Sequence, residues 1–203
     1  MTMPRIKNIV FDFGGVLIDW NPELLYRKVF ATKEEMDFFL SEIATPEWNI
    51  QQDAGHPLSE ATAVLQAQYP EYKDEIALFY GRWGDMLGGI LEENVALIKP
   101  LKQKYKLYGL TNWSAETLPI AMARYDFFGD LDGIVVSGEE KLVKPDKRLF
   151  QILLDRYRLK PEESIFIDDN GVNVCAAEEM GFHALHLTPG VNLEKALRNF
   201  VNF

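Results

Sequence analysis

The sequence IKNIVFDFGG (residues 6–15) contains a compact run of Ile, Val and Phe that stops at Asp12 and two glycines. A short β-branched and aromatic run that is closed by a turn signal is typical of a buried strand. Glycines after such a strand let the backbone turn sharply and approach a ligand closely. Asp12 therefore stands either as the cap of a turn or at the rim of a binding site.

Four further apolar runs are predicted strands, and each ends in polar residues. They are Tyr105–Leu110, Gly133–Val136, Ser164–Ile167 and Phe182–Leu187. Helical patterns follow them at Ser114–Tyr125, Pro145–Leu159, Gly171–Met180 and Leu193–Val201. Strands that alternate with helices predict an α/β fold, here a three-layer Rossmann-like core with a mainly parallel sheet. Ligands of such sheets bind at the carboxyl ends of the strands.

The stretch between Asp19 and about Gly84 has helical patterns and no good strand. The patterns cover Pro22–Phe30, Lys33–Ile43, Leu58–Tyr69 and Tyr72–Trp83, and Glu92–Lys104 leads back to the sheet. Four helices are enough for a small bundle. We therefore expect a catalytic core of residues 1–18 and 85–203, with a small inserted helical-bundle cap at 19–84.

Composition excludes several classes of protein. The 203 residues are 47% hydrophobic, and 21 Lys and Arg stand against 31 Asp and Glu, a formal charge of −10. This excess argues against nucleic acid and anionic membranes as partners. The single cysteine excludes an internal disulfide and a thiolate metal cluster. With no signal-peptide pattern and no run long enough to span a membrane, the expected location is cytoplasmic.

Adjacent carboxylates follow the strand Ser164–Ile167, and this pair is the sharpest chemical feature. Asp168 and Asp169 are costly side by side unless a cation or hydrogen-bond donors offset them. Carboxylate oxygens suit Mg²⁺ better than a softer metal. The alternative is an exposed acidic pair in a loop.

Other polar residues also follow predicted strands or begin predicted helices. Thr111 and Asn112 end the second strand and either hold a phosphate oxygen or cap the next helix. Lys144 precedes Pro145 at a helix start, where backbone amides favour anions, or else it is an ordinary surface lysine.

Taken in order, the motifs DFGGV (12–16), LTN (110–112), KPD (144–146) and IDDN (167–170) resemble those of the haloacid dehalogenase-like (HAD) superfamily. The resemblance covers nearly the whole chain, including a helical cap between the first two motifs. It implies a hydrolase, and most closely a Mg²⁺-dependent phosphatase acting on a small phosphorylated metabolite.

The resemblance also implies roles for individual residues. Asp12 is similar to the nucleophile that forms an aspartyl-phosphate. Thr111 would hold the phosphate by its hydroxyl and Asn112 by its backbone amide, while Lys144 would neutralise nucleophile and substrate. The expected metal ligands are Asp12, the carbonyl of Gly14, Asp168 and Asp169, with Asp169 the direct ligand of the acidic pair.

A charge count agrees with a metal at this position. The three aspartates and Lys144 sum to −2, which would repel a phosphate dianion by kilocalories in a partly buried site. Mg²⁺ brings the sum to zero and bridges nucleophile and phosphoryl oxygen. Phosphoryl transfer depends mainly on such positioning and neutralisation.

Gly14 departs from most phosphatases of this superfamily, which carry a second Asp there as general acid and base. Such assistance is typically worth about 10²–10⁴-fold. Three explanations remain open: a good leaving group, as in a sugar 1-phosphate; a substitute acid from the cap, Asp53 or His56; or a different reaction. The motif Asp-x-Gly-x-Val and the helical cap resemble a subgroup that contains sugar-1-phosphate phosphatases, which favours the first explanation.

The different reaction would be that of a 2-haloacid dehalogenase, which uses the same Asp nucleophile without a metal. A non-catalytic binder of a phosphorylated ligand is the remaining alternative. Whether the protein is an enzyme or a binder, the candidate substrate-binding residues are Gly14, Gly15, Trp20, Asp53, His56, Arg82 and Trp113. Arg82 is equally open as a surface ion pair with Glu75 or Asp85, and the aromatic residues as core.

Overall fold

A five-stranded sheet organises the molecule, which is described here from a computed structural model over residues 6–202. The strands are β1 (Asn8–Phe11), β4 (Lys106–Thr111), β5 (Gly133–Val136), β6 (Ser164–Asp168) and β7 (His183–His186). They pair in parallel in the order β5-β4-β1-β6-β7. The α/β, Rossmann-like fold expected from the alternation of strands and helices is confirmed. Residues 1–5 of the expected core segment lie outside the described residues.

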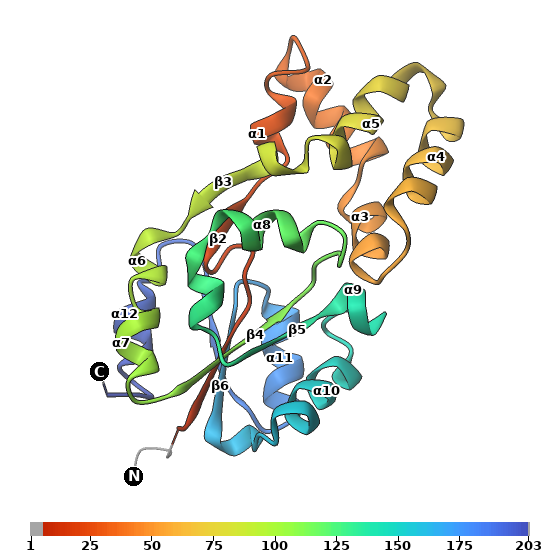
Figure 1. Ribbon diagram of the computed structural model, residues 1–203. Coiled ribbons are helices and arrows are strands. Elements are labelled where there is room, and N and C mark those ends of the chain that lie inside the picture. The colour runs from red at the N-terminus through yellow and green to blue at the C-terminus, as the bar shows by residue number, and fades with distance from the viewer. Residues whose placement is uncertain (1–5, 203) are drawn as a thin grey trace.

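Helices cover both faces of this sheet (Figure 1). On one face lie α10 (Lys147–Tyr157) and α11 (Gly171–Glu179), and on the other α7 (Ile98–Lys102) and α12 (Leu193–Leu197). Alternate residues of β1 enter different cores: Val10 packs with the first pair of helices, while Ile9 and Phe11 pack on the opposite side. This alternation is the period of two that a strand imposes on its side chains.

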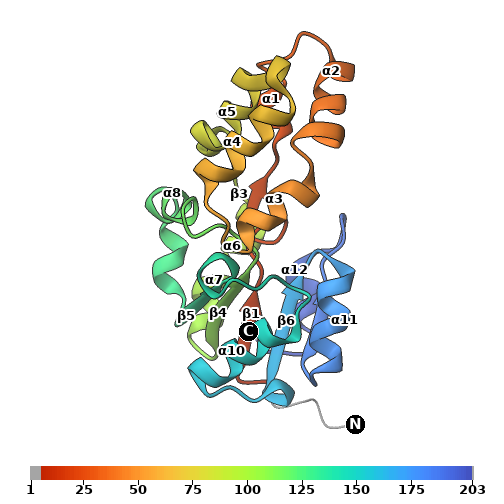
Figure 2. The ribbon, with the colours of Figure 1, turned by 90° about the vertical axis from the view of Figure 1, so that its right-hand side faces the viewer.

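Five helices between the first and second strands of the sheet stand above its carboxyl edge (Figures 1 and 2). They are α1 (Glu23–Tyr26), α2 (Lys33–Phe38), α3 (Pro46–Asp53), α4 (Leu58–Gln68) and α5 (Lys73–Gly81), with a π-helix at Phe39–Ile43 after α2. A capping box begins α2, since the Thr32 hydroxyl accepts from the Glu35 amide and the Glu35 carboxylate accepts from the Thr32 amide. We call residues 19–84 the helical segment.

The expectation of no strand at the start of the helical segment was wrong. Strand β2 (Ile18–Trp20) pairs antiparallel with β3 (Leu87–Ile90) and forms a two-stranded link between the sheet and the helices. Two further helices, α6 (Glu92–Val95) and α7, then lead into β4, and α8 (Leu118–Arg124) and α9 (Ser137–Glu140) follow β4 and β5. Within residues 6–202, no helix has the length and apolar character needed to cross a membrane.

The position of β1 explains where a ligand can bind. After β1 the chain adds β4 and β5 on one side, then crosses to the other side to add β6 and β7. The strand order therefore reverses at β1, and a crevice opens at the carboxyl end of a strand where the order reverses. Asp12 directly follows β1 at that point.

Candidate active site

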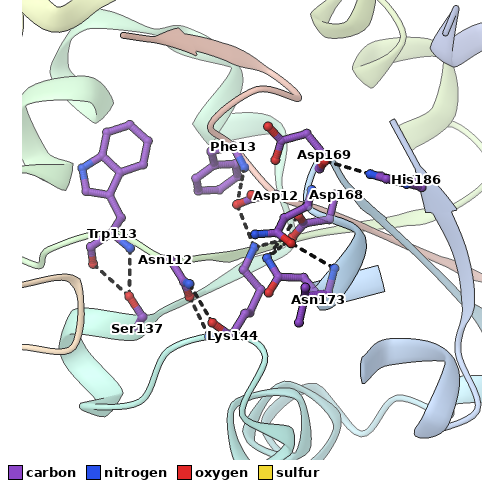
Figure 3. A network of polar contacts seen from close by, with 12 residues as sticks. Asp12, Phe13, Asn112, Trp113, Ser137, Lys144, Asp168, Asp169, Asn173 and His186 are labelled. Carbon is purple, nitrogen blue, oxygen red and sulfur yellow. Dashed lines mark hydrogen bonds and ion pairs between the residues drawn. The ribbon is translucent and has the colours of Figure 1, made fainter. Parts of the chain in front are cut away.

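Three carboxylates meet at the carboxyl edge of the sheet. Phe11 pairs with Ile167 in the register of β1 and β6, so the next residues, Asp12 and Asp168, lie side by side. One ligand oxygen from each of Asp12, Asp168 and Asp169 lies within 4.8 Å of the others (Figure 3). The structure thus brings the sequence-predicted acidic residues together from two distant parts of the chain.

The loop after β1 holds Asp12 in place. The Asp12 amide donates to the Ile167 carbonyl at 2.9 Å, and the Asp12 carboxylate accepts from the Phe13 amide at 2.8 Å. The Phe13 carbonyl then accepts from the amides of Leu17 and Ile18 at 2.8 and 2.9 Å, which closes the loop tightly. One backbone bond thus fixes the main chain of Asp12, and a second fixes its carboxylate.

Gly15 lets the two acidic segments approach each other. Its φ of +69° is in the left-handed region, which glycine adopts without steric cost. A Cβ atom at this position would lie 2.1 Å from Oδ2 of Asp169. Any side chain there would therefore displace Asp169 from the cluster.

Lys144 is completely buried between two of the carboxylates. Its Nζ lies 2.9 Å from Asp12 Oδ1 and 2.7 Å from Asp168 Oδ2, and its side chain has no exposed surface. Burial alone would lower the pKa of Lys144, but the charges of Asp12 and Asp168 hold that pKa above its usual value. The lysine is therefore a fixed positive charge beside Asp12, and not the surface lysine that the sequence left open.

Asn112 positions the backbone of Lys144 through a reciprocal pair of hydrogen bonds. The Asn112 side-chain amide donates to the Lys144 carbonyl at 3.0 Å, and the Lys144 amide donates to Asn112 Oδ1 at 2.7 Å. Thr111 precedes Asn112 at the buried end of β4. The second and third motifs are thus joined to each other as well as to the acidic cluster.

Asn173 and Ser137 belong to this network and were missed by sequence reasoning. Asn173, on α11, donates its side-chain amide to both oxygens of Asp168, at 3.2 and 3.1 Å. Ser137 accepts from the Trp113 amide at 2.8 Å and donates to the Asp53 carbonyl at 2.5 Å. The sequence does contain a signal for Asn173, since it is a polar residue in the first turn of the helix that follows the acidic pair. A side chain at that place can face back to the end of the strand.

A small cavity of about 90 Å³ lies above Asp12 and reaches the helical segment. Its lining includes the expected Asp12, Gly14, Trp20, Asp53, Asn112 and Trp113, together with Asn49 and Trp83. Among the described residues, nothing lies within 4 Å of where a Gly14 Cβ would be. The missing side chain at this position thus leaves open space beside Asp12.

Asp53 brings a buried carboxylate from the end of α3 to this cavity. Its side chain accepts from the Asn49 amide at 3.2 Å, and Asn49 in turn lies 3.0 Å from the Tyr80 hydroxyl. Burial raises the pKa of Asp53 to about 7, a hydrogen bond from the Ser114 amide opposes this rise, and the charge of Asp12 adds to it.

Three other predicted substrate-binding residues do not line this cavity: Gly15, His56 and Arg82. His56 is exposed on the loop after α3, although it follows closely on Asp53. Arg82 is exposed and forms an ion pair with Asp85, with Nε 2.8 Å from the carboxylate. This is the surface ion pair that the sequence had left open as the alternative to a substrate contact.

The donor set of the acidic cluster fits a hard divalent cation. Three carboxylates and one lysine leave a charge of −2, and carboxylate oxygens are the ligands that Mg²⁺ prefers. Burial raises the pKa of Asp12 to about 7 even though Lys144 opposes the rise. Burial and the charge of Asp168 also raise the pKa of Asp169. A bound cation would offset the burial and the repulsion by Asp168 that raise these pKa values.

Comparison with known proteins agrees with this geometry. The family model described as haloacid dehalogenase-like hydrolase matches residues 6–181. A sesquiterpene phosphatase from Aspergillus oryzae is 27% identical over 96% of this chain and 96% of its own length. A phosphoglycolate phosphatase from Vibrio vulnificus is 24% identical over 95% of this chain and 88% of its own.

A solved structure has the same fold. It is a HAD family enzyme from Bacteroides thetaiotaomicron in complex with magnesium and inorganic phosphate, with a TM-score of 0.71 and 23% identity. The match covers 94% of this chain and 98% of that one.

Proposed function

We infer, from the premise that this chain belongs to the haloacid dehalogenase-like hydrolase family, that it is a Mg²⁺-dependent phosphatase acting on a small phosphate monoester. The observation that carries this proposal is the Asp12 carboxylate, which belongs to the three-carboxylate cluster, contacts buried Lys144 and lines the small cavity. Two relatives that match nearly the whole chain are named as phosphatases, which supports the same reaction.

In the proposed reaction, Asp12 is the nucleophile. One of its carboxylate oxygens attacks phosphorus, the bond from phosphorus to the ester oxygen breaks, and an aspartyl-phosphate forms. Water then attacks that phosphorus and releases phosphate, so that Asp12 is regenerated. Lys144 neutralises the nucleophile and a phosphoryl oxygen throughout, and the Thr111 hydroxyl and the Asn112 amide would hold the other oxygens.

Asp12, Asp168, Asp169 and the carbonyl of Gly14 are the groups that would hold Mg²⁺. Bound there, the ion supplies neutralisation of the phosphoryl charge and a fixed point for one phosphoryl oxygen. Asp168 is itself oriented by Lys144 and Asn173, so its place in the cluster does not depend on the ion alone.

Asp53 is our candidate for the acid that protonates the departing oxygen, in place of the Asp that Gly14 lacks. Asp53 lines the same small cavity as Asp12, and we call its side at Asp12 the floor and its side at Asp53 the roof. Because Gly14 has no side chain, an ester oxygen has room between the two. His56 is exposed outside that cavity, which favours Asp53 of the two candidates. A general acid here is worth about 10²–10⁴-fold for a poor leaving group.

The helical segment, residues 19–84, is proposed as a cap over a core formed by 1–18 and 85–203. It contributes Trp20, Asn49, Asp53 and Trp83 to the cavity, while the sheet contributes Asp12 and Asn112. Residues of the cap would then select the organic part of the substrate, and residues of the sheet would perform the chemistry.

The test is phosphate release from a panel of phosphate monoesters, including sugar 1-phosphates and nucleotides, with Mg²⁺ and with EDTA. We expect turnover with Mg²⁺ and none with EDTA. Halide release from 2-haloacids that continues in EDTA would instead favour the dehalogenase. No turnover of any ester, including an activated aryl phosphate, would favour the non-catalytic binder.

A further inference from the structure

A second, mostly apolar groove of about 330 Å³ lies in the helical segment beside the catalytic cavity. Its wall comes from the β2–α1 junction, the π-helix, α3 and α5. The apolar side chains that form it include Pro22, Leu40, Ala44, Ile50 and Phe79. Its volume is at the lower end of the range typical of small-molecule sites.

The groove adjoins the catalytic cavity, and the two spaces share three lining residues. Trp20, Asn49 and Asp53 line both spaces. An ester with its phosphorus at Asp12 would have to pass these residues for its organic part to reach the groove. The catalytic cavity, about 90 Å³, has room for little beyond the phosphoryl group and the first atoms of that organic part.

Charge and hydrogen bonding indicate what the groove accepts. Among the described residues that line it, Asp53 is the single ionisable side chain, so the groove offers no cation for a second phosphate. The Thr45 hydroxyl already accepts from the Trp48 amide as the cap of α3, and Asn49 and Asp53 are bonded to each other. The buried indole Nε1 of Trp20 has no partner among the described residues, but one donor cannot replace the hydration of a polyhydroxylated body, whereas a hydrocarbon body would gain by burial.

We propose that the preferred substrate is the phosphate monoester of an apolar alcohol, whose hydrocarbon part fills the groove lined by Leu40, Ala44, Ile50 and Phe79. This inference rests on the proposed phosphatase function and specifies its substrate class. A sugar 1-phosphate, the substrate class suggested by Gly14 in the sequence, is the competing outcome of the test.

The test measures kcat/KM for a series of n-alkyl phosphates from ethyl to octyl, below their micellar concentrations and with saturating Mg²⁺. Burial of one methylene is worth ~0.8 kcal/mol, so each added carbon should raise kcat/KM about threefold to fourfold until the groove is full. Glucose 1-phosphate is assayed beside them and should be a poorer substrate than octyl phosphate.

Two variants locate the effect in the groove. Ile50→Thr keeps the branch at Cβ but replaces the ethyl group with a hydroxyl, which removes apolar surface from the groove, and its loss in kcat/KM should grow with chain length. Val64→Thr makes a similar change at an exposed position of α4, outside the groove, and should leave the dependence on chain length as in the wild type. If Ile50→Thr does not fold, the chain-length series on the wild-type protein alone still decides the proposal.

The possible outcomes distinguish failure of the apolar substrate class from failure of the phosphatase function. No turnover of any phosphate ester with Mg²⁺ would overturn the phosphatase itself. Turnover of ethyl and octyl phosphate at equal kcat/KM, or a clear preference for glucose 1-phosphate, would overturn the apolar substrate class and leave the phosphatase standing. Equal chain-length dependence in both variants would place the hydrocarbon outside the groove.

Discussion

At the scale of single residues, the site depends on a few side chains that carry charge at very short range. Lys144 contacts both Asp12 and Asp168, Asn173 holds Asp168 from the other side, and Gly15 lets Asp169 approach. Breaking a buried ion pair by removing one partner leaves an uncompensated charge. Substitutions of these residues should therefore lower the catalytic rate or the metal affinity.

Asp12→Asn is expected to lower kcat by about a thousandfold or more, because an amide cannot attack phosphorus as the carboxylate does. Phosphate release from an activated aryl phosphate measures the loss, and circular dichroism checks the fold. Asp37→Asn, on the exposed surface of α2, is the matched control and should behave as the wild type. Turnover by Asp12→Asn near the wild-type rate would refute the covalent role.

Asn173→Ala should weaken the binding of Mg²⁺ without removing any proposed ligand, because Asn173 orients Asp168. Loss of such an outer partner typically costs 10–100-fold in metal affinity. The measurement is the Mg²⁺ concentration that gives half-maximal activity, which we expect to rise by about that factor. Asn199→Ala, at an exposed position near the end of the chain, serves as control. An unchanged titration curve for Asn173→Ala would argue against this positioning role.

Asp53 gives the molecule a pH-dependent stability whose sign can be worked out. Its pKa is raised from 3.8 to about 7 in the folded chain, so the folded state holds a proton that the unfolded chain has released. The stabilisation is complete below pH 3.8 and is lost as the pH rises toward 7. The charge of Asp12 on the core adds to the rise, while the neighbouring Tyr80 on α5 is uncharged because burial raises the pKa of its hydroxyl.

We therefore expect Asp53→Asn to be more stable than the wild type at pH 8, by up to about 4 kcal/mol, and nearly equal to it at pH 4. Urea unfolding at several pH values measures the difference. A difference in free energy of unfolding that stays constant from pH 4 to pH 8 would contradict the raised pKa.

At the scale of elements, the strands were predictable because their apolar runs are short and end in polar residues. The run Gly133–Val136 is the strand β5 itself, and Ser164–Ile167 differs from β6 by one residue. Parallel strands in a covered sheet are buried on both faces, so such runs carry a strong signal. The carboxyl ends of these strands then gave the positions of Asp12, Asn112 and Asp168.

The helical segment was less predictable, for identifiable reasons. Helix α3 was missed because Pro46–Asp53 is mostly polar and has no clear apolar stripe. Its burial comes from tertiary contacts that no local pattern reveals, such as the Ser137 bond to the Asp53 carbonyl. Strand β2 has only three residues, and its partner β3 contains two adjacent glycines, so neither has the composition typical of a strand.

At the scale of the whole molecule, the helical segment is attached to the core by covalent connections and by hydrogen bonds at two places. The strands β2 and β3 connect the two covalently, and the Arg124 guanidinium donates to the Gly84 carbonyl at 2.8 Å beside that connection. Across the cavity, the Leu58 amide at the start of α4 donates to Glu116 at 3.0 Å, and Ser137 donates to the Asp53 carbonyl at 2.5 Å. The last two links hold the roof of the cavity over Asp12.

Removing both of these distant links should loosen the roof while leaving the proposed nucleophile and metal ligands intact. For Ser137→Ala combined with Glu116→Ala, we expect faster amide hydrogen exchange at residues 53–58 and a higher KM, because the open form no longer aligns Asp53 with the floor. Each lost bond to a helix end or backbone carbonyl should cost about 0.5–2 kcal/mol. Ser59→Ala with Glu71→Ala, two exposed positions of the helical segment, is the matched control. Exchange at residues 53–58 that stays at the wild-type rate in the double variant would mean that the remaining links, namely the β2–β3 connection and the bonds of Arg124 to Gly84 and of Ser114 to Asp53, are enough to hold the helical segment over Asp12.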